Sequence, residues 1–201
     1  MIKILFPSDV YKRLRAYVLA IDTEISFLGK IDKKDDVLTI SDIALLKQES
    51  TYGSTILDQE ALGQFYNELM DKGEDPSSWK AWIHSHARME TFFSTKDLET
   101  IESFDLEVPT DNWFLSVVVN HAGGVRARID VFSPFRHTMD KLSWDIVFTD
   151  PTLSEQVKQE IAEKVTTIEY RYNGRTDWRK ELEKLKRREL RGQILLPNGV
   201  D

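Results

Sequence analysis

The sequence predicts an α/β fold in which a mixed central sheet carries helices on its faces. Residues 79–83, 113–120 and 125–132 are rich in β-branched and aromatic side chains, as buried strands are. Over residues 10–20, apolar side chains recur at helical spacing. Strands interspersed with helices in this way are typical of layered α/β domains. The 201 residues, 41% of them hydrophobic, suffice to bury a sizeable core.

The first half of the chain is expected to form two helices and three strands. A short strand covers residues 2–6, and Ser8 is the expected cap of a helix over residues 10–20. Strands at residues 24–31 and 37–46 flank a hairpin-like turn. Residues 51–57 fit either the rim of a site or a plain loop. Asp58 is a suitable N-cap for a helix that continues to Met70 and ends near Gly73.

The second half is expected to hold the remaining strands and a third helix. The strand at residues 79–83 runs into His84, and a helix extends from Ser94 to about Phe104. Two strands, at residues 113–120 and 125–132, are joined by a turn, and a last strand or extended segment covers residues 142–148. Residues 1–150 therefore form the predicted domain, and residues 151–201 a C-terminal helical extension.

Within this extension, residues 171–191 predict a basic amphipathic helix. Lys and Arg outnumber Asp and Glu there, and Trp178, Leu182 and Leu185 share one helical face. The simplest interpretation is that this face packs on the domain. An oligomer or partner contact, and recognition of an acidic protein or nucleic acid, stay open as alternatives.

One short segment combines four side chains that can carry chemistry: His84, His86, Ser94 and Asp97. Residues i and i+2 of a strand point to the same face, so both imidazoles should enter one space. Ser followed by an acid three residues later marks a helix start. Asp97 is therefore expected in a first helical turn that faces back toward the strand end.

Two His and one carboxylate, with an open fourth position for water, form a standard ligand set for catalytic zinc. Glu24, on an apolar segment upstream, could serve as the base for that water. Each part has a plainer interpretation, because His-x-His is usually surface chemistry, Ser-x-x-Asp usually a cap, and a lone Glu usually solvated. The joint spacing favours the metal site.

This pattern resembles the JAMM (MPN+/JAB) metalloprotease motif, which is Glu, then His-x-His, then Ser and Asp at these offsets. The resemblance implies one Zn²⁺ per chain held by His84, His86 and Asp97. It makes Glu24 the catalytic acid/base and Ser94 the helper that stabilises the oxyanion. It also implies a cytidine-deaminase-like three-layer α/β/α fold for residues 1–150.

The resemblance has limits that the sequence itself displays. The segment from Glu24 to Gly29 matches the family's glycine-containing strand only loosely, and Ala87 stands where the family commonly has Pro. The stretch from 99 to 112 is too short for the added zinc loop of some eukaryotic members. The resemblance is therefore to the prokaryotic or viral type.

The expected function is hydrolysis of a peptide or isopeptide bond in a protein or peptide substrate, such as a ubiquitin-like or sulfur-carrier modifier. Two alternatives remain: a non-catalytic binding or scaffold protein on the same fold, and a RadC-like DNA-associated protein. His121 and His137 are not expected to be ligands. Metal-dependent phosphoesterases usually require more histidines than the four present.

Composition excludes several other classes. Without cysteine, the chain has no disulfide, no thiol nucleophile and no Cys-based zinc site, so cytidine-deaminase chemistry is excluded. A formal charge of −7 argues against general nucleic-acid binding. No signal peptide or apolar stretch of membrane-spanning length is evident, so a cytoplasmic protein without a membrane role is expected.

Overall fold

The computed structural model describes residues 2–107, 113–150, 152 and 159. The chain divides into two units, Met1–Ser154 and Glu155–Asp201. The expected helical extension over residues 151–201, with its basic helix at 171–191, lies outside the described residues except at positions 152 and 159. None of the helices in the described part combines the length and the apolar character that crossing a membrane requires.

Strands and helices alternate along the described chain, as the sequence predicts. In chain order the elements are β1 (Lys3–Pro7), α1 (Ser8–Leu19), β2 (Ser26–Lys34), β3 (Val37–Ala44), β4 (Gln48–Thr51), β5 (Ser54–Leu57), α2 (Gln59–Asp71), the short 3₁₀ helix η1 (Pro76–Ser78), β6 (Ala81–Ser85), α3 (Thr95–Glu107), β7 (Trp113–Val119), β8 (Val125–Val131), β9 (His137–Met139) and β10 (Ser143–Val147).

The main sheet has eight strands in the order β10-β1-β3-β2-β6-β7-β8-β9. Strand β1 is parallel to β10 and β3, and β6 is parallel to β7, whereas the other neighbours are antiparallel. The predicted α/β class with a mixed sheet is thus confirmed. Strand β6, which leads into the two clustered histidines, lies in the interior of the sheet and is buried along its whole length.

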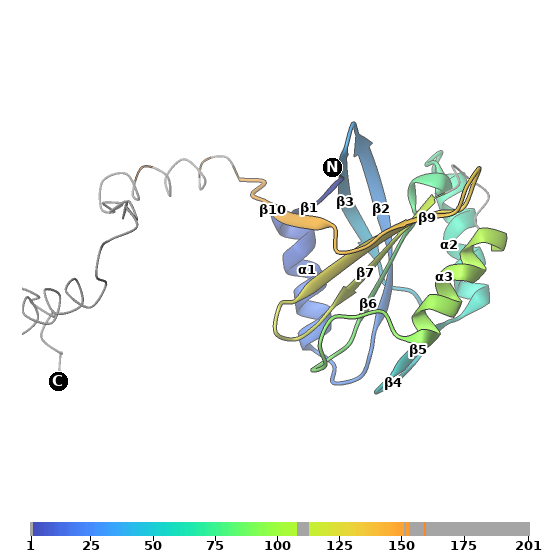
Figure 1. Cartoon of the computed structure of the whole chain (residues 1–201), viewed down its shortest axis with the longest axis horizontal. Coiled ribbons are helices and arrows are strands. Elements are labelled where there is room, and N and C mark those ends of the chain that lie inside the picture. The colour runs from blue at the N-terminus through green and yellow to red at the C-terminus, as the bar shows by residue number, and fades with distance from the viewer. Residues whose placement is uncertain (1, 108–112, 151, 153–158, 160–201) are drawn as a thin grey trace, which may run out of the picture. The chain divides into compact units, whose positions relative to one another are not determined.

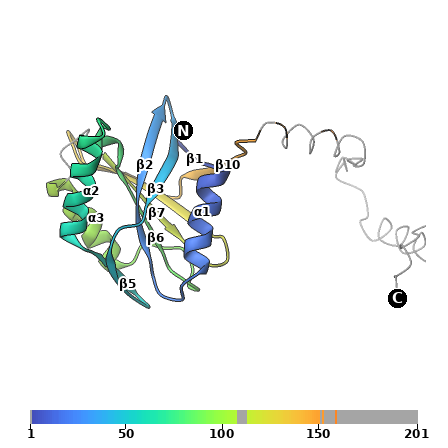
Figure 2. The same ribbon diagram turned by 180° about the vertical axis from the view of Figure 1, so that it is seen from behind.

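Helices cover both faces of this sheet. Alternate residues of a strand point to opposite faces, so Ile83 joins the core beneath α1 while Trp82 packs against α3. Helix α2 contributes Leu69 to a smaller cluster with Leu28 and Trp79. Figures 1 and 2 show α1 on one side of the sheet and α2 and α3 on the other. The face that carries α2 and α3 is the one on which the site lies.

Of the helix caps predicted at Asp58 and Ser8, the first is confirmed and the second is wrong. The side chain of Asp58 accepts a hydrogen bond from the Ala61 N–H at 2.9 Å, so the predicted cap of α2 is confirmed. Ser8 is not a cap, because α1 begins at Ser8 itself and its N-cap position is Pro7. The Ser8 hydroxyl lies 3.1 Å from Thr149 Oγ1 instead. Helix α1 follows β1 directly, which leaves no residue free for a capping turn.

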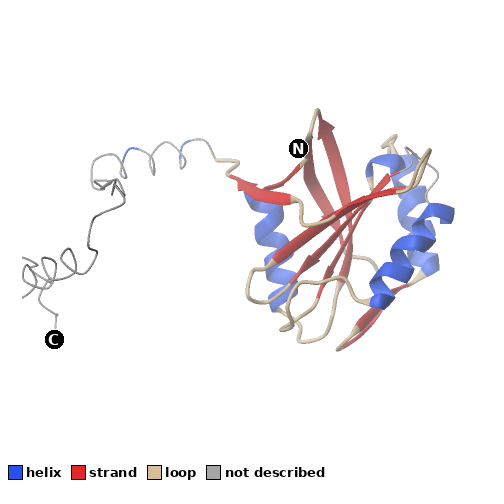
Figure 3. Cartoon of the chain, in the orientation of Figure 1, coloured by secondary structure: helices blue, strands red, loops and turns tan. Residues whose placement is uncertain are grey.

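Strand boundaries are shifted by a few residues, and two local features differ from expectation. The strand expected at 24–31 is Ser26–Lys34, so Glu24 lies in the loop before it. The open segment 51–57 belongs to a hairpin, β4–β5, that projects away from the main sheet (Figure 3). The short edge strand β9 was not predicted, because its three residues are too few to show a pattern.

A close approach between β2 and β6 fixes how the site strand sits in the sheet. The two strands are antiparallel, with Ser26 opposite His84. A Cβ atom at Gly29 would come within 2.9 Å of Ala81 Cβ, closer than real Cβ contacts allow. Glycine at this position therefore lets the two strands pack at the observed distance.

Candidate metal centre

Strand β6 brings both imidazoles of the motif into one buried space. His84 lies within the strand, and His86 follows its last residue, with the His86 N–H donating to Val119 O of β7 at 2.9 Å. Because β7 still supports His86, the two residues keep the strand geometry that points i and i+2 to the same face. His84 is 1% exposed and His86 2% exposed.

Asp97 joins them from the first turn of α3. Its Oδ1 lies 3.4 Å from His84 Nε2, and its Oδ2 lies 3.5 Å from His86 Nε2. One potential ligand atom from each of the three residues lies within 4.8 Å of the other two. The structure therefore brings together the three predicted ligands as a buried group that could hold a metal ion.

The imidazole of His84 gives an independent reason to expect a cation here. Both of its ring nitrogens are buried, and neither has a hydrogen-bond partner within the described part of the chain. A buried polar group without a partner costs about 1–3 kcal/mol. A metal ion bound through one of these nitrogens would offset that cost. The donor set, two imidazoles and a carboxylate, fits such an ion.

The protonation states of His84 and Asp97 suit a cation. Burial lowers the pKa of His84, which favours the neutral imidazole that metal binding requires. Burial alone would raise the pKa of Asp97, but the nearby His84, His86 and Ser94 side chains outweigh it and hold the pKa well below its usual range. Asp97 is therefore ionised at neutral pH, as a ligand carboxylate must be.

His86 is oriented by a contact on the far side of its ring. Its Nδ1 lies 3.1 Å from the carbonyl oxygen of Glu90. A carbonyl oxygen only accepts, so Nδ1 must carry the proton, and the lone pair of neutral His86 is then on Nε2, the atom nearest Asp97. Contacts of this kind fix the tautomer and orientation of metal-binding histidines. Burial lowers the pKa of His86, but Asp97, Glu90 and Glu24 raise it overall, so protonation of His86 would compete with metal binding.

Ser94 and Asp97 also form a helix cap, so the plainer interpretation of their spacing is confirmed, and it is compatible with the functional one. Asp97 Oδ2 accepts from the Ser94 N–H at 2.7 Å, and Ser94 Oγ accepts from the Asp97 N–H at 3.2 Å. This reciprocal pair is a capping box. It fixes the Asp97 carboxylate toward the histidines.

Glu24 lies near this group but is not one of its three members. It precedes the point at which β2 pairs with β6, where Ser26 lies opposite His84 and the Ser85 N–H donates to Ile25 O at 2.9 Å. Hairpin β4–β5 holds the backbone there, since the Glu24 N–H donates to Thr51 O at 2.9 Å and the Ser50 hydroxyl donates to Glu24 O. The residue is 5% exposed.

The electrostatic surroundings of Glu24 fit a proton acceptor. Burial raises its pKa, the charge of Asp97 raises it further, and the charges of His86 and Lys96 lower it in part. A carboxylate whose pKa is raised toward neutrality is better matched to general base catalysis. The sequence pattern does not predict a role for Lys96, although its position between Ser94 and Asp97 places it beside the site.

The turn after His86 holds Ala87 in a conformation that proline does not adopt. Ala87 is buried and adopts φ +43°, whereas Pro fixes φ near −65°. The turn is ordered by hydrogen bonds, because the Met89 N–H donates to His86 O at 2.8 Å and the His121 N–H donates to Ala87 O at 2.7 Å. Asn120 adds a bond from Nδ2 to Met89 O at 2.8 Å. Backbone and amide contacts thus order this turn without a proline.

We expect Ala87→Gly to stabilise the fold slightly and Ala87→Pro to destabilise it by more than about 1 kcal/mol. The left-handed conformation costs a non-glycine residue about 1–2 kcal/mol, and glycine removes this cost at an entropic penalty of about 0.4–1 kcal/mol. Thermal unfolding of both variants measures the effect. Ala61→Gly, the same exchange within α2, is the control and should destabilise. Destabilisation by Ala87→Gly would contradict this account.

The other two histidines lie outside the group, as expected. His121 is half-buried rather than exposed, and its Nε2 lies 3.1 Å from Ile21 O. Arg15 of α1 donates to Asn120 O and, at 2.6 Å, to His121 O, which ties this turn to α1. His137 is exposed on the edge strand β9. Both histidines therefore lie outside the candidate site.

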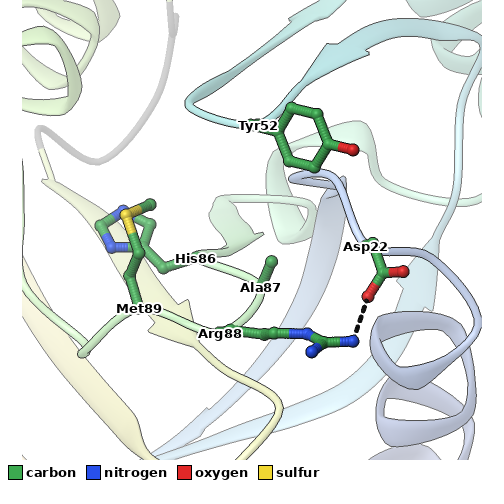
Figure 4. Close-up of a pocket in the computed structure, with 6 residues that line it drawn as sticks. All are labelled: Asp22, Tyr52, His86, Ala87, Arg88 and Met89. Atoms are coloured by element: carbon green, nitrogen blue, oxygen red, sulfur yellow. Dashed lines mark hydrogen bonds and ion pairs between the residues drawn. The ribbon is translucent and has the colours of Figure 1, made fainter.

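An open cavity of about 430 Å³ adjoins the metal centre. Its lining residues are Asp22, Tyr52, His86, Ala87, Arg88 and Met89 (Figure 4). Tyr52 comes from the turn of the β4–β5 hairpin, and Arg88 pairs with Asp22 at 3.0 Å. The hairpin that the sequence left undefined therefore supplies both a contact to Glu24 and a wall of the cavity.

Comparisons with known proteins bear on the fold alone. No protein-family model and no curated protein matches the sequence. Among solved structures, the solution structure of protein DSY2949 from Desulfitobacterium hafniense is similar, with a TM-score of 0.50 and 10% sequence identity. The match covers 74% of this chain and 96% of that one. At this identity, the similarity concerns the arrangement of the elements.

Proposed function

We propose that this chain is a zinc-dependent hydrolase of the JAMM type that cleaves a peptide or isopeptide bond. The observation that carries the proposal is the buried group of His84, His86 and Asp97, in which the His84 nitrogens have no hydrogen-bond partner among the described residues. Glu24 lies beside this group with a raised pKa. The substrate class is a protein or peptide, for which ubiquitin-like and sulfur-carrier modifiers are candidates.

Zinc is the metal that the donor set favours. Two imidazole nitrogens and one carboxylate oxygen leave the fourth tetrahedral position open, as in catalytic zinc sites. Calcium and magnesium prefer all-oxygen sets, which two histidines do not provide. Helices on both faces of a mixed sheet, with the ligand strand in its interior, support the finer assignment to a cytidine-deaminase-like α/β/α fold.

Each protein residue has one task in the reaction. His84, His86 and Asp97 would hold the metal, which would supply Lewis acidity toward a water and the scissile carbonyl. Glu24 accepts a proton from the attacking water and delivers it to the leaving nitrogen. Ser94 donates its hydroxyl to the carbonyl oxygen as negative charge develops there. A C–O bond forms and the C–N bond breaks, which yields a carboxylate and an amine without a covalent enzyme intermediate.

We expect Ser94→Ala to lower kcat by about 10²–10³-fold at unchanged zinc content, because one oxyanion donor is lost. The same variant should lose about 1 kcal/mol of stability, since Ser94 Oγ also caps α3. Steady-state kinetics and thermal unfolding on one preparation separate the two effects. Ser94→Thr keeps a hydroxyl for both tasks and should retain most of the rate. Loss of stability at full rate in Ser94→Ala would mean that the residue only caps the helix.

The experiment that tests the proposal is zinc content by mass spectrometry in the wild type and in His86→Ala. We expect about one zinc per wild-type chain, lost in His86→Ala and retained in His137→Ala, the control that removes an exposed histidine. Zinc-loaded and chelated wild type are then compared on isopeptide-linked ubiquitin-like proteins and on peptides. Absence of zinc from the wild type after zinc is supplied would contradict the hydrolase and favour a binding module.

A further inference from the structure

The cavity beside His86 has a wall of exposed apolar side chains. Tyr52, at the tip of the β4–β5 hairpin, is 78% exposed, and Met89 is 42% exposed. The buried Ala87 also lines the cavity. Large apolar side chains that surround a concavity next to a candidate active site are typical of ligand-binding pockets. They favour a neutral, apolar occupant.

The charges at the cavity point to the same kind of occupant. Arg88 and Asp22 both line it and pair with each other at 3.0 Å, and both side chains remain largely exposed. A charged group that entered would meet a cation and an anion together, so it would gain little net attraction. The flat guanidinium of Arg88 can instead stack on an aromatic ring. In Figure 4, Tyr52 lies on one side of the cavity and the Arg88–Asp22 pair on another.

The size and position of the cavity suit a side chain of a bound polypeptide. At about 430 Å³, it falls within the range of small-ligand pockets and far exceeds what a glycine residue needs. His86, a candidate metal ligand, is itself a lining residue, and the next three residues of the chain continue the wall. Neighbouring residues of an extended peptide lie about 3.3–3.6 Å apart along the chain. A peptide whose carbonyl reaches the metal centre would therefore have an adjacent side chain within reach of the cavity.

We propose that this cavity is a specificity pocket that binds the aromatic or bulky apolar side chain of a peptide substrate, at a residue near the bond to be cleaved. The proposal rests on the proposed hydrolase function. Tyr52 is the specificity-determining residue, because its ring offers the largest exposed aromatic surface of the cavity. Glycine and acidic residues are disfavoured, the first for lack of contact and the second because the Arg88–Asp22 pair offers a charged group little net attraction.

The test measures peptide binding and therefore does not depend on turnover. Three blocked pentapeptides, identical except for Phe, Gly or Glu at the central position, are titrated into the zinc-supplemented Glu24→Gln variant and followed by NMR. We expect the Phe peptide to bind about tenfold or more tightly than the other two. Adding Tyr52→Ala should reduce the affinity for the Phe peptide to that for the Gly peptide, whereas Tyr52→Phe should retain it.

A matched control and a zinc measurement make each outcome decisive. Phe135 is an aromatic residue that is 82% exposed and is not among the cavity's lining residues, so Phe135→Ala should leave the preference unchanged. Equal binding of the three peptides, or a preference that survives Tyr52→Ala, would overturn the pocket. If zinc is bound and no preference appears, the metal centre stands and the pocket fails. If the Phe preference appears in a chain that binds no zinc, the pocket stands and the hydrolase fails.

Discussion

The Glu24→Gln variant should bind zinc as the wild type does and hydrolyse its substrate about 10²–10⁴-fold more slowly. Glutamine has nearly the same shape as glutamate, so it fits the buried position and leaves the backbone bond to Thr51 in place. It cannot accept the proton of the attacking water, which is the step that a general base accelerates by this factor. Zinc content and kcat, measured on one preparation, test both halves of the expectation.

The control is Glu99→Gln, the same exchange at an exposed position of α3, which should leave both quantities unchanged. Loss of zinc in Glu24→Gln would make Glu24 a ligand, and an unchanged rate would remove it from the reaction.

The pH dependence of the wild-type rate provides a further test of Glu24. Because burial raises the pKa of Glu24, its basic form is lost on acidification at a higher pH than for an exposed glutamate. The rate should accordingly begin to fall at that higher pH.

Asp97→Asn should weaken zinc binding at least about a hundredfold while the fold keeps most of its stability. Structural zinc sites are worth about 10–16 kcal/mol over four ligands, or about 3 kcal/mol for each ligand. Asparagine lacks the charge but can still accept from the Ser94 N–H, so the capping box is retained in part. A titration against a chromogenic chelator measures the zinc affinity, and thermal unfolding without metal measures the fold.

Asp97→Ala is the companion variant, because it removes the ligand and the cap together. It should bind zinc as poorly as Asp97→Asn and lose about 1 kcal/mol more stability in the absence of metal. The difference between the two variants isolates the cap from the ligand. If Asp97→Asn bound zinc with wild-type affinity, the carboxylate would be only a helix cap, and the site would lack its third ligand.

The buried group of His84, His86 and Asp97 could be predicted because it depends on local structure. His84 and His86 share a face by the geometry of one strand, and Asp97 is placed by a helix start within the same segment of the chain, 11 residues after His86. Glu24 comes from farther away in the sequence, and its place beside the site depends on the pairing of β2 with β6. The family resemblance indicated this residue, whereas the periodicity alone placed it wrongly inside the strand.

The remaining features of the site depend on contacts that no local pattern reveals. The turn at Ala87 is held by His121 and Asn120, which follow a different strand. The hairpin that carries Tyr52 has strands of only four residues each, which are too short to show a clear alternation of apolar and polar side chains. Ser8 resembled a cap because of its residue type, but the direct passage from β1 to α1 left its hydroxyl to Thr149. Contacts between residues this far apart in the sequence can be identified only from the folded structure.

The stacking of Trp82 on His84 gives the molecule an optical signal of its own. The two rings lie 4.2 Å apart between centroids and 23° from parallel. An indole in such contact should change its emission when the charge on the imidazole changes, so metal uptake could be followed by fluorescence in real time before any substrate is known. A Trp82→Phe variant would identify that signal among the five tryptophans of the chain.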